Sequence, residues 1–550
     1  MQSRTLMWVT VTTFVASLTS AVQPSAQSQD FTTFEWPSVA INPAVANHSF
    51  MRAVRALALS ILGLVVLAPL ALAATPGHTM RGFLLRGPQA IPSGDQSSTT
   101  GPQYGLFTCQ VVGLSTRDCI DPYQMRRAYQ VDSLIAQGYD GRGQTIVIVD
   151  AFQNPNLVAQ VATFDNFYGL PAIQLTQVAP DGLTPFDQTD ANMLGWAEEI
   201  SLDVEWSHAI APAANIVLVL AKSNADADIV SALNYAVNNS LGNVVSMSFG
   251  ENESCLGTDL ITAYHNAFAS ATAKNITLLA SSADEGAALP TCDGASWVKA
   301  VSQPASDPLV TGVGGTELTV AKYCLSSLGC NPAANPDPGT YLSETAWNEG
   351  LPYGDYGDVF GYGTLSGGGG FSVVFDEPPY QKGVLPGGKQ RAVPDVAYSA
   401  AVLHGVLTYL AIPGIPSGFY LFGGTSAGAP QWSAITAIAD QRAGTSLGFL
   451  NSGIYHAVRA KMDYAASFHD VTVGTNSSLQ FDSSGNPVDV IGFNAGTGWD
   501  AATGSGSPIT PGIVDDLVRY VSPGDGTAVL ANTKPKPNPK PVGPTNVTPH

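Results

Sequence analysis

The chain has 550 residues, 45% of them hydrophobic and only 12% charged, which suits one large folded domain with appendages. It contains 23 basic and 43 acidic residues and therefore has a formal net charge of −20. This balance argues against nucleic acid as a partner and against binding to anionic membranes.

The N-terminal part resembles an export signal. Residues 51–73 carry Arg52 and Arg55 near their start and continue as an apolar run from Leu57 to Leu70. They end in Ala71-Leu72-Ala73, which is typical of a cleavage site. The run is short for a membrane span of ~20 residues, so we expect a cleaved signal peptide and no stable membrane anchor. Residues 1–50 are then an N-terminal extension that is not translated if synthesis starts at Met51. We expect a secreted, extracellular protein.

Composition divides the remainder into three parts. Residues 74–103 are polar and lack periodicity, as in a flexible linker or a short pro-region. Residues 104–521 hold the folded domain, for which we expect a monomer. Residues 522–550 include alternating lysine and proline from Lys534 to Pro541, which predicts an extended, disordered tail.

The six cysteines lie in three pairs close in sequence. An even count in an exported chain favours disulfides, and short loops close at little entropic cost. We therefore expect Cys109–Cys119, Cys255–Cys292 and Cys324–Cys330, although six cysteines allow other pairings. There is no CxxC pair, so a zinc site is not expected.

Buried-strand and helix patterns alternate along the folded domain. Apolar runs predict strands at residues 145–149, 216–220, 244–248, 276–280 and 309–313. Helical patterns occupy residues 156–168, 194–210, 227–237 and 259–273. This alternation predicts an α/β fold with a mostly parallel central sheet and helices on both faces. Ligands of such folds bind beyond the carboxyl ends of the strands.

A glycine-rich stretch from Gly423 to Pro430 contains Ser426. The glycines allow a tight turn, and Pro430 suits the first turn of a helix that we expect over Gln431–Arg442. Ser426 would then present an exposed hydroxyl near a helix N-terminus, as nucleophilic serines do. A Gly-Ser loop that only caps the helix is the alternative.

A nucleophilic serine needs a base. His208 lies where a predicted helix ends, so we interpret it as a helix C-terminal histidine. Glu199 and Asp203 are four residues apart and adjacent on one helix face, where their repulsion raises at least one pKa. A solvated acidic face is the alternative. Asp284 follows the strand predicted at residues 276–280, which places it at the ligand-facing edge of the sheet, unless it caps a turn or helix.

Glu199, Asp203, Asp284 and the stretch Gly424–Pro430, in this order, resemble the sedolisin (serine-carboxyl peptidase) family. The resemblance covers about residues 123–521. It implies a subtilisin-like fold and an acid endopeptidase or tripeptidyl-peptidase that acts on polypeptides.

The resemblance also implies roles. Ser426 would be the nucleophile, Glu199 the general base, and Asp203 the residue that orients Glu199. Asp284 would donate a hydrogen bond to the oxyanion. Glu199 must then be ionised while Asp284 keeps its proton, which favours hydrolysis at roughly pH 3–6.

Two residues depart from the family pattern. Many members have a glutamate and a tryptophan that extend the carboxylate network, where this chain has Asp150 and Phe249. Asp150 has a shorter arm, and the ring of Phe249 cannot donate a hydrogen bond. Family precursors also commonly carry a large folded prosegment, for which residues 74–103 are too few.

Two loops resemble the calcium loops of the family, at residues 468–474 and 495–500. They imply one structural Ca²⁺ ion with oxygen ligands only, as Ca²⁺ prefers. The ligands would be the carboxylates of Asp470 and Asp500 and the carbonyls of Val471, Gly496 and Gly498.

Two other functions stay open at this point. A non-catalytic, secreted peptide-binding or surface protein on the same fold is favoured by the substituted network residues. A conventional Ser-His-Asp hydrolase would require a histidine such as His208 beside Ser426.

Overall fold

The computed structural model describes residues 105–115, 118–350, 363–385, 389–522, 524–531, 533–537 and 548–549. The expected N-terminal extension, signal peptide and linker lie outside these residues, as does part of the expected tail. The described residues all belong to one compact unit, Thr75–His550. Within them, no helix has both the length and the apolar character needed to cross a bilayer.

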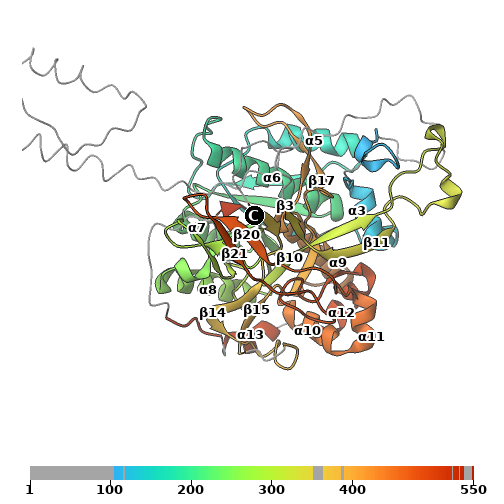
Figure 1. Cartoon of the computed structure of the whole chain (residues 1–550). Coiled ribbons are helices and arrows are strands. Elements are labelled where there is room, and N and C mark those ends of the chain that lie inside the picture. Colours follow the sequence, from blue (N-terminus) through green and yellow to red (C-terminus); the bar gives the residue numbers. More distant parts are fainter. Residues whose placement is uncertain are drawn as a thin grey trace, which may run out of the picture. The chain divides into compact units, whose positions relative to one another are not determined.

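An eight-stranded sheet forms the centre of the described part of the chain (Figure 1). Its strand order is β11-β10-β6-β4-β1-β3-β2, and β16 also pairs with β10. All of these pairings are parallel except that of β10 with β11. The strands are β1 (Thr145–Ala151), β2 (Gln174–Val178), β3 (Asn215–Ala221), β4 (Val244–Met247), β6 (Thr277–Ser281), β10 (Thr311–Val320), β11 (Tyr341–Ala346) and β16 (Val396–Ser399).

The inner strands are buried on both faces. In β6 every residue is buried, and β1 is buried from Ile146 to Ala151. Because successive side chains of a strand point to opposite faces, both faces of the sheet must be covered. The covering helices form two packed groups, α6 with α9 and α7 with α8. These helices are α6 (Ala191–Ile210), α7 (Asp226–Asn238), α8 (Thr258–Ala273) and α9 (Thr425–Ala443). The predicted α/β fold with a mostly parallel sheet is confirmed.

Smaller elements surround this centre (Figure 1). The further helices are α3 (Pro122–Ala128), α4 (Val131–Ala136), α5 (Leu157–Tyr168), α10 (Asn451–Arg459), α11 (Lys461–Ser467), α12 (Thr510–Tyr520) and α13 (Asp525–Leu530). Outside the sheet, the strands used below are β5 (Phe249–Asn252), β7 (Ala288–Pro290), β8 (Trp297–Lys299), β9 (Ser302–Gln303), β14 (Gly370–Asp376), β17 (Val406–Leu410), β20 (Ser478–Phe481), β21 (Pro487–Val490) and β23 (Thr548–Pro549).

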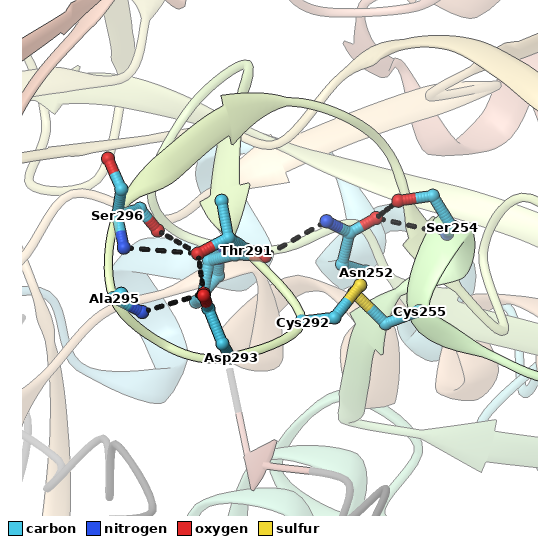
Figure 2. Close-up of a disulfide and its surroundings, with 9 residues drawn as sticks. Asn252, Ser254, Cys255, Thr291, Cys292, Asp293, Ala295 and Ser296 are labelled. Atoms are coloured by element: carbon cyan, nitrogen blue, oxygen red, sulfur yellow. Dashed lines mark hydrogen bonds between the residues drawn. A yellow bond between two sulfur atoms is a disulfide. The ribbon is translucent and has the colours of Figure 1, made fainter. Parts of the chain in front are cut away.

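All three predicted disulfides are present. Figure 2 shows Cys255–Cys292, which joins the short 3-10 turn after β5 (Glu253–Cys255) to the loop between β7 and β8. Beside it, the amide of Asn252 donates to the carbonyl of Pro290 at 2.9 Å, and its Oδ1 accepts from Ser254. The disulfide and these hydrogen bonds fix the path of the chain where it leaves β5.

The glycines at residues 367–370 approach the chain's own backbone. A Cβ on Gly368 would lie 1.9 Å from the carbonyl oxygen of Ser282, and one on Gly369 would lie 2.1 Å from that of Ala501. The absence of side chains at these positions lets the segment pack beside the end of β6.

Candidate active site

Helix α6 carries Glu199 and Asp203 into the interior. Asp190 caps its N-terminus by accepting from the N–H groups of Asn192 and Met193. Every residue from Gly195 to Ile210 is buried, so the helix has no solvated face in that stretch. The alternative of a solvated acidic face is therefore wrong.

Ser426 is the second residue of α9, which packs against α6. The predicted start at Gln431 is wrong, because the helix begins at Thr425 directly after Gly424, whose φ of 92° makes the required turn. Pro430 lies inside the helix, where it has no N–H to donate to the carbonyl of Ser426 four residues earlier. The predicted exposure is also wrong, since Ser426 is fully buried.

Three buried carboxyl groups cluster beside Ser426. They are Glu199, Asp203 and Asp150, the last from the carboxyl end of β1. Burial, followed by the charges of Asp203 and Asp150, raises the pKa of Glu199 well above its usual range. Burial and the charge of Asp150 do the same to the pKa of Asp203, and burial raises the pKa of Asp150 to about 8.

The hydroxyl of Ser426 faces Glu199. It is close enough to act as a hydrogen-bond donor that lowers the pKa of Glu199, against the larger effect of burial. The contact does not reach full hydrogen-bond geometry, and Oγ of Ser426 and Oε1 of Glu199 have no other partner among the described residues. Catalytic hydrogen bonds are commonly long in a ligand-free enzyme.

Ser248 orients the next carboxyl group. Its hydroxyl donates to Oδ1 of Asp203 at 2.9 Å. Asp150 differs, because neither of its carboxyl oxygens has a hydrogen-bond partner in the described part of the chain. Phe249 follows Ser248 and packs its ring against Trp196 at 6.0 Å between centroids, so it supplies no donor to the cluster.

Asp284 contacts the first residue of α9, Thr425. Its Oδ1 accepts two hydrogen bonds from Thr425, from the backbone N–H at 2.7 Å and from the hydroxyl at 2.9 Å. The capping role considered as the alternative is thus present, since Thr425 is the first residue of the helix. Burial raises the pKa of Asp284 to about 7 against these two bonds, and its charge also raises the pKa of Glu199.

The described histidines lie away from Ser426. Nε2 of His208 lies 2.8 Å from the carbonyl of Pro171 and 3.3 Å from Oδ1 of Asp165. It occupies the last turn of α6, as predicted. The ring of His265 contacts Asp307, whereas His404, His456 and His469 contact Leu318, Tyr520 and Tyr341. The described part of the chain offers no histidine base to Ser426.

Two functional positions were not recognised in the sequence. Thr425 fixes Asp284, and the hydroxyl of Ser248 fixes Asp203. Both residues adjoin recognised motifs, but a sequence does not show which side chain a threonine or serine hydroxyl contacts across the fold.

The two predicted calcium loops meet in the structure. The N–H of Gly498 donates to both carboxylate oxygens of Asp470, at 3.0 and 3.2 Å. Asp500 accepts from Gly496 at 2.9 Å, and both carboxylates raise the pKa of Tyr464 after the larger effect of burial.

The carboxylate and carbonyl oxygen atoms of these two loops are the type of ligand that a hard cation such as Ca²⁺ prefers. The structure shows no hydrogen bond to the carbonyl oxygens of Val471, Gly496 and Gly498 among the described residues. Within the described ranges, no group of three or more His, Cys, Asp or Glu side chains could hold a metal ion. A metal site at these loops would therefore need backbone carbonyl oxygens as further ligands.

The chain resembles several known peptidases, although it matches no protein-family model. It is 32% identical over 413 residues to kumamolisin from Bacillus sp. (strain MN-32), covering 73% of this chain and 64% of that protein. It is 32% identical over 286 residues to sedolisin from Pseudomonas sp. (strain 101), covering 51% of this chain and 41% of that protein. The chain therefore spans less than two thirds of the length of these relatives.

A comparison with solved structures also finds a sedolisin. Pseudomonas sedolisin, a serine-carboxyl proteinase complexed with two molecules of pseudo-iodotyrostatin, superposes with a TM-score of 0.57 at 26% identity. The match covers 73% of this chain and 98% of that one. Together with the buried carboxyl groups around Ser426, these similarities support the assignment of the chain to the sedolisin family.

Proposed function

We propose that this protein is a serine-carboxyl peptidase that hydrolyses peptide bonds of polypeptides at acidic pH. The observation that supports this best is the hydroxyl of Ser426, buried without a hydrogen-bond partner beside the carboxyl group of Glu199. An unsatisfied buried hydroxyl is costly, and a reacting group is a common reason for one.

Ser426 acts as the nucleophile in this proposal. Its Oγ forms a bond to the carbonyl carbon of the scissile peptide while its proton passes to Glu199. The C–N bond then breaks as Glu199 returns the proton to the leaving amine, which leaves an acyl ester on Ser426. Water then attacks the ester carbon while its proton passes to Glu199, and the C–Oγ bond breaks as Glu199 returns that proton to Oγ of Ser426, which releases the acid. Asp203, fixed by Ser248, orients Glu199 throughout.

Asp284 and the start of α9 stabilise the oxyanion. Oδ1 of Asp284 is engaged by Thr425, and the structure shows no hydrogen bond at its Oδ2 among the described residues. A proton on Oδ2 would be free to point at the oxyanion. The backbone N–H of Ser426 lies in the first turn of α9, where helix N–H groups lack intrahelical partners, and it supplies a second donor.

A calcium ion at the two C-terminal loops is part of the proposal. Asp470 and Asp500 would provide carboxylate oxygens, and Val471, Gly496 and Gly498 would provide carbonyl oxygens. Bound there, the ion would hold two loops together and would take no part in the reaction.

Secretion and the mode of cleavage are further parts of the proposal. The three disulfides support an exported protein, because disulfides persist in oxidising compartments.

Among the relatives, tripeptidyl-peptidase 1 of Mus musculus is 29% identical over 299 residues, covering 44% of that protein. Mass spectrometry of the products from a long peptide distinguishes internal cleavage from the release of tripeptides.

The test is hydrolysis of casein by the purified protein at acidic pH, with two matched serine variants. Ser426→Ala should abolish hydrolysis. Ser433→Ala changes a buried serine of the same helix whose hydroxyl bonds only the carbonyl of Ala429, and it should keep activity. Equal activity of Ser426→Ala and the wild type would refute the proposed function.

A further inference from the structure

Strand β5 leads directly out of the candidate site. It follows β4 after Ser248, the residue that donates to Asp203. Its second half pairs with β9, through Glu251 with Gln303 and Asn252 with Ser302. The disulfide of Figure 2 fixes the segment that follows. The first half of β5 therefore lies beside the carboxyl cluster, and the pairing with β9 and the disulfide hold the residues that follow it.

This first half is paired with a remote segment of the same chain. Thr548 pairs with Gly250 and Pro549 with Phe249, in antiparallel orientation, as strand β23. Strand β23 also lies against α6, the helix that carries Glu199 and Asp203. Almost 300 residues of sequence separate the two strands, so their pairing is a tertiary contact.

The tail has a second anchor closer to the folded domain. The N–H of Lys536 donates to the carbonyl of Val374 at 3.0 Å. Its Nζ lies 2.6 Å from Oδ1 of Asp376, also on β14. Before this point α13 packs on α8 and buries Val529. These contacts hold α13 and Lys536 on the folded domain.

We propose that segment Thr548–Pro549 occupies the strand edge at which a peptide substrate binds, so that the chain's own tail competes with substrate. The inference rests on the proposed peptidase function. An extended peptide adds to an exposed strand edge through backbone hydrogen bonds, largely regardless of its sequence. The edge of β5 lies next to α6, the helix that carries Glu199 and Asp203, and is suited to hold such a peptide; β23 occupies it in this structure.

The competition is weak and reversible. Strand β23 has two residues, and Pro549 has no N–H, so Thr548 is its one backbone donor. Tethering compensates for this weakness, because the segment belongs to the same chain as the site, and a tethered ligand reaches an effective concentration on the order of millimolar. Substrate must displace the segment before it binds, which raises KM and leaves kcat unchanged.

Three variants test the proposal. Removal of residues 538–550 retains Lys536 and deletes β23. Thr548→Pro removes the N–H of Thr548, and Thr548→Ala keeps it as the matched control. We expect KM to fall about threefold or more in the first two variants, with kcat unchanged, and to stay at the wild-type value in the control. A peptide with the sequence of residues 538–550 should inhibit the truncated enzyme competitively at millimolar concentration.

Amide hydrogen exchange gives a readout that does not need activity. Hydrogen-bonded and non-bonded pairs alternate along an antiparallel ladder, and Pro549 opposite Phe249 cannot donate, so Gly250 is the residue of β5 whose N–H bonds to β23. The amide of Gly250 should therefore exchange faster after truncation and in Thr548→Pro than in the wild type. An unchanged KM in both variants, or unchanged exchange, would overturn the proposal. If the protein hydrolyses no peptide, the proposed function fails. Exchange then decides alone whether the segment occupies β5: faster exchange after truncation supports that occupancy, and unchanged exchange overturns it.

Discussion

Thr425 donates two hydrogen bonds to one carboxyl oxygen of Asp284, at 2.7 and 2.9 Å. Because Thr425 immediately precedes Ser426, the proposed nucleophile and the proposed oxyanion donor are positioned by a single residue. The other oxygen of Asp284 is left to carry the proton. Burial keeps that proton bound, since it raises the pKa of Asp284 to about 7.

Replacement of Glu199 by glutamine should lower kcat roughly 10²–10⁴-fold, because the amide cannot accept the proton of Ser426. Glu205→Gln is the control on the same helix. Glu205 is equally buried, but it accepts from Gln160 and from the N–H of Tyr409 and does not face Ser426. Glu205→Gln should keep kcat within about threefold of the wild-type value, because Glu205 takes no proton from Ser426. Similar losses in the two variants would show that the effect is structural.

The substitution Asp150→Asn should leave the acid limb of the kcat/KM profile in place. Burial raises the pKa of Asp150 to about 8, so its carboxyl group is neutral over the pH range of that limb. The charge through which Asp150 raises the pKa of Glu199 develops only as pH approaches 8. A pH profile of kcat/KM between pH 3 and 7 checks this expectation, and an acid limb that moves to lower pH in Asp150→Asn would mean that Asp150 is charged there.

Folding stability should be greater near pH 5 than at pH 8. Burial raises the pKa of Asp150 and Glu285 to about 8 and of Asp284 and Asp440 to about 7. Each group therefore stabilises the fold fully below its unfolded pKa of about 4, and this contribution is lost as pH rises through the folded value.

A melting curve checks this dependence on pH. We expect Tm to fall by roughly 5 °C or more between pH 5 and pH 8. Burial lowers the pKa of His469 to about 4, so this group opposes the trend by destabilising the fold as pH falls below about 6.5. A Tm that rises steadily from pH 5 to pH 8 would contradict the burial of the carboxyl cluster.

Calcium should raise Tm, because a ligand that binds only the folded state stabilises it. Asp500→Asn should abolish this increase while its remaining oxygen still accepts from the loop N–H groups. Asp482→Ala is the control, since Asp482 lies in an exposed turn between β20 and β21 and bonds only its own turn. An unchanged Tm of the wild type after EDTA treatment would refute the calcium site.

Much of the sheet was predictable because its strands are continuous apolar runs. The predicted strand at residues 145–149 became β1 with two further residues, and the runs at 216–220 and 276–280 also became strands of the central sheet. The run at 309–313 was less informative. Strand β10 continues to Val320, because its second half pairs with β11, and that contact is not encoded in local periodicity.

The site was predictable in its residues and less so in its environment. Proline signals a helix start, but α9 begins five residues before Pro430 because Gly424 supplies the turn there. The burial of α6 from Gly195 to Ile210 depends on α5, α9 and β17, which pack around it from distant parts of the sequence. The pairing of β23 with β5 could not be expected from a tail rich in lysine and proline.

The most direct test of the carboxyl mechanism compares the pH dependence of kcat/KM in the wild type and in Asp284→Asn. Asparagine can still accept from Thr425, and it donates through an amide that does not ionise. We expect the wild type to lose activity as pH rises through about 7, where Asp284 ionises. The lost oxyanion donor should cost about 10²–10³-fold in kcat. The variant should keep its activity to higher pH, even if its maximum is lower. A wild-type optimum near pH 8, with the same alkaline limb in Asp284→Asn, would contradict the mechanism.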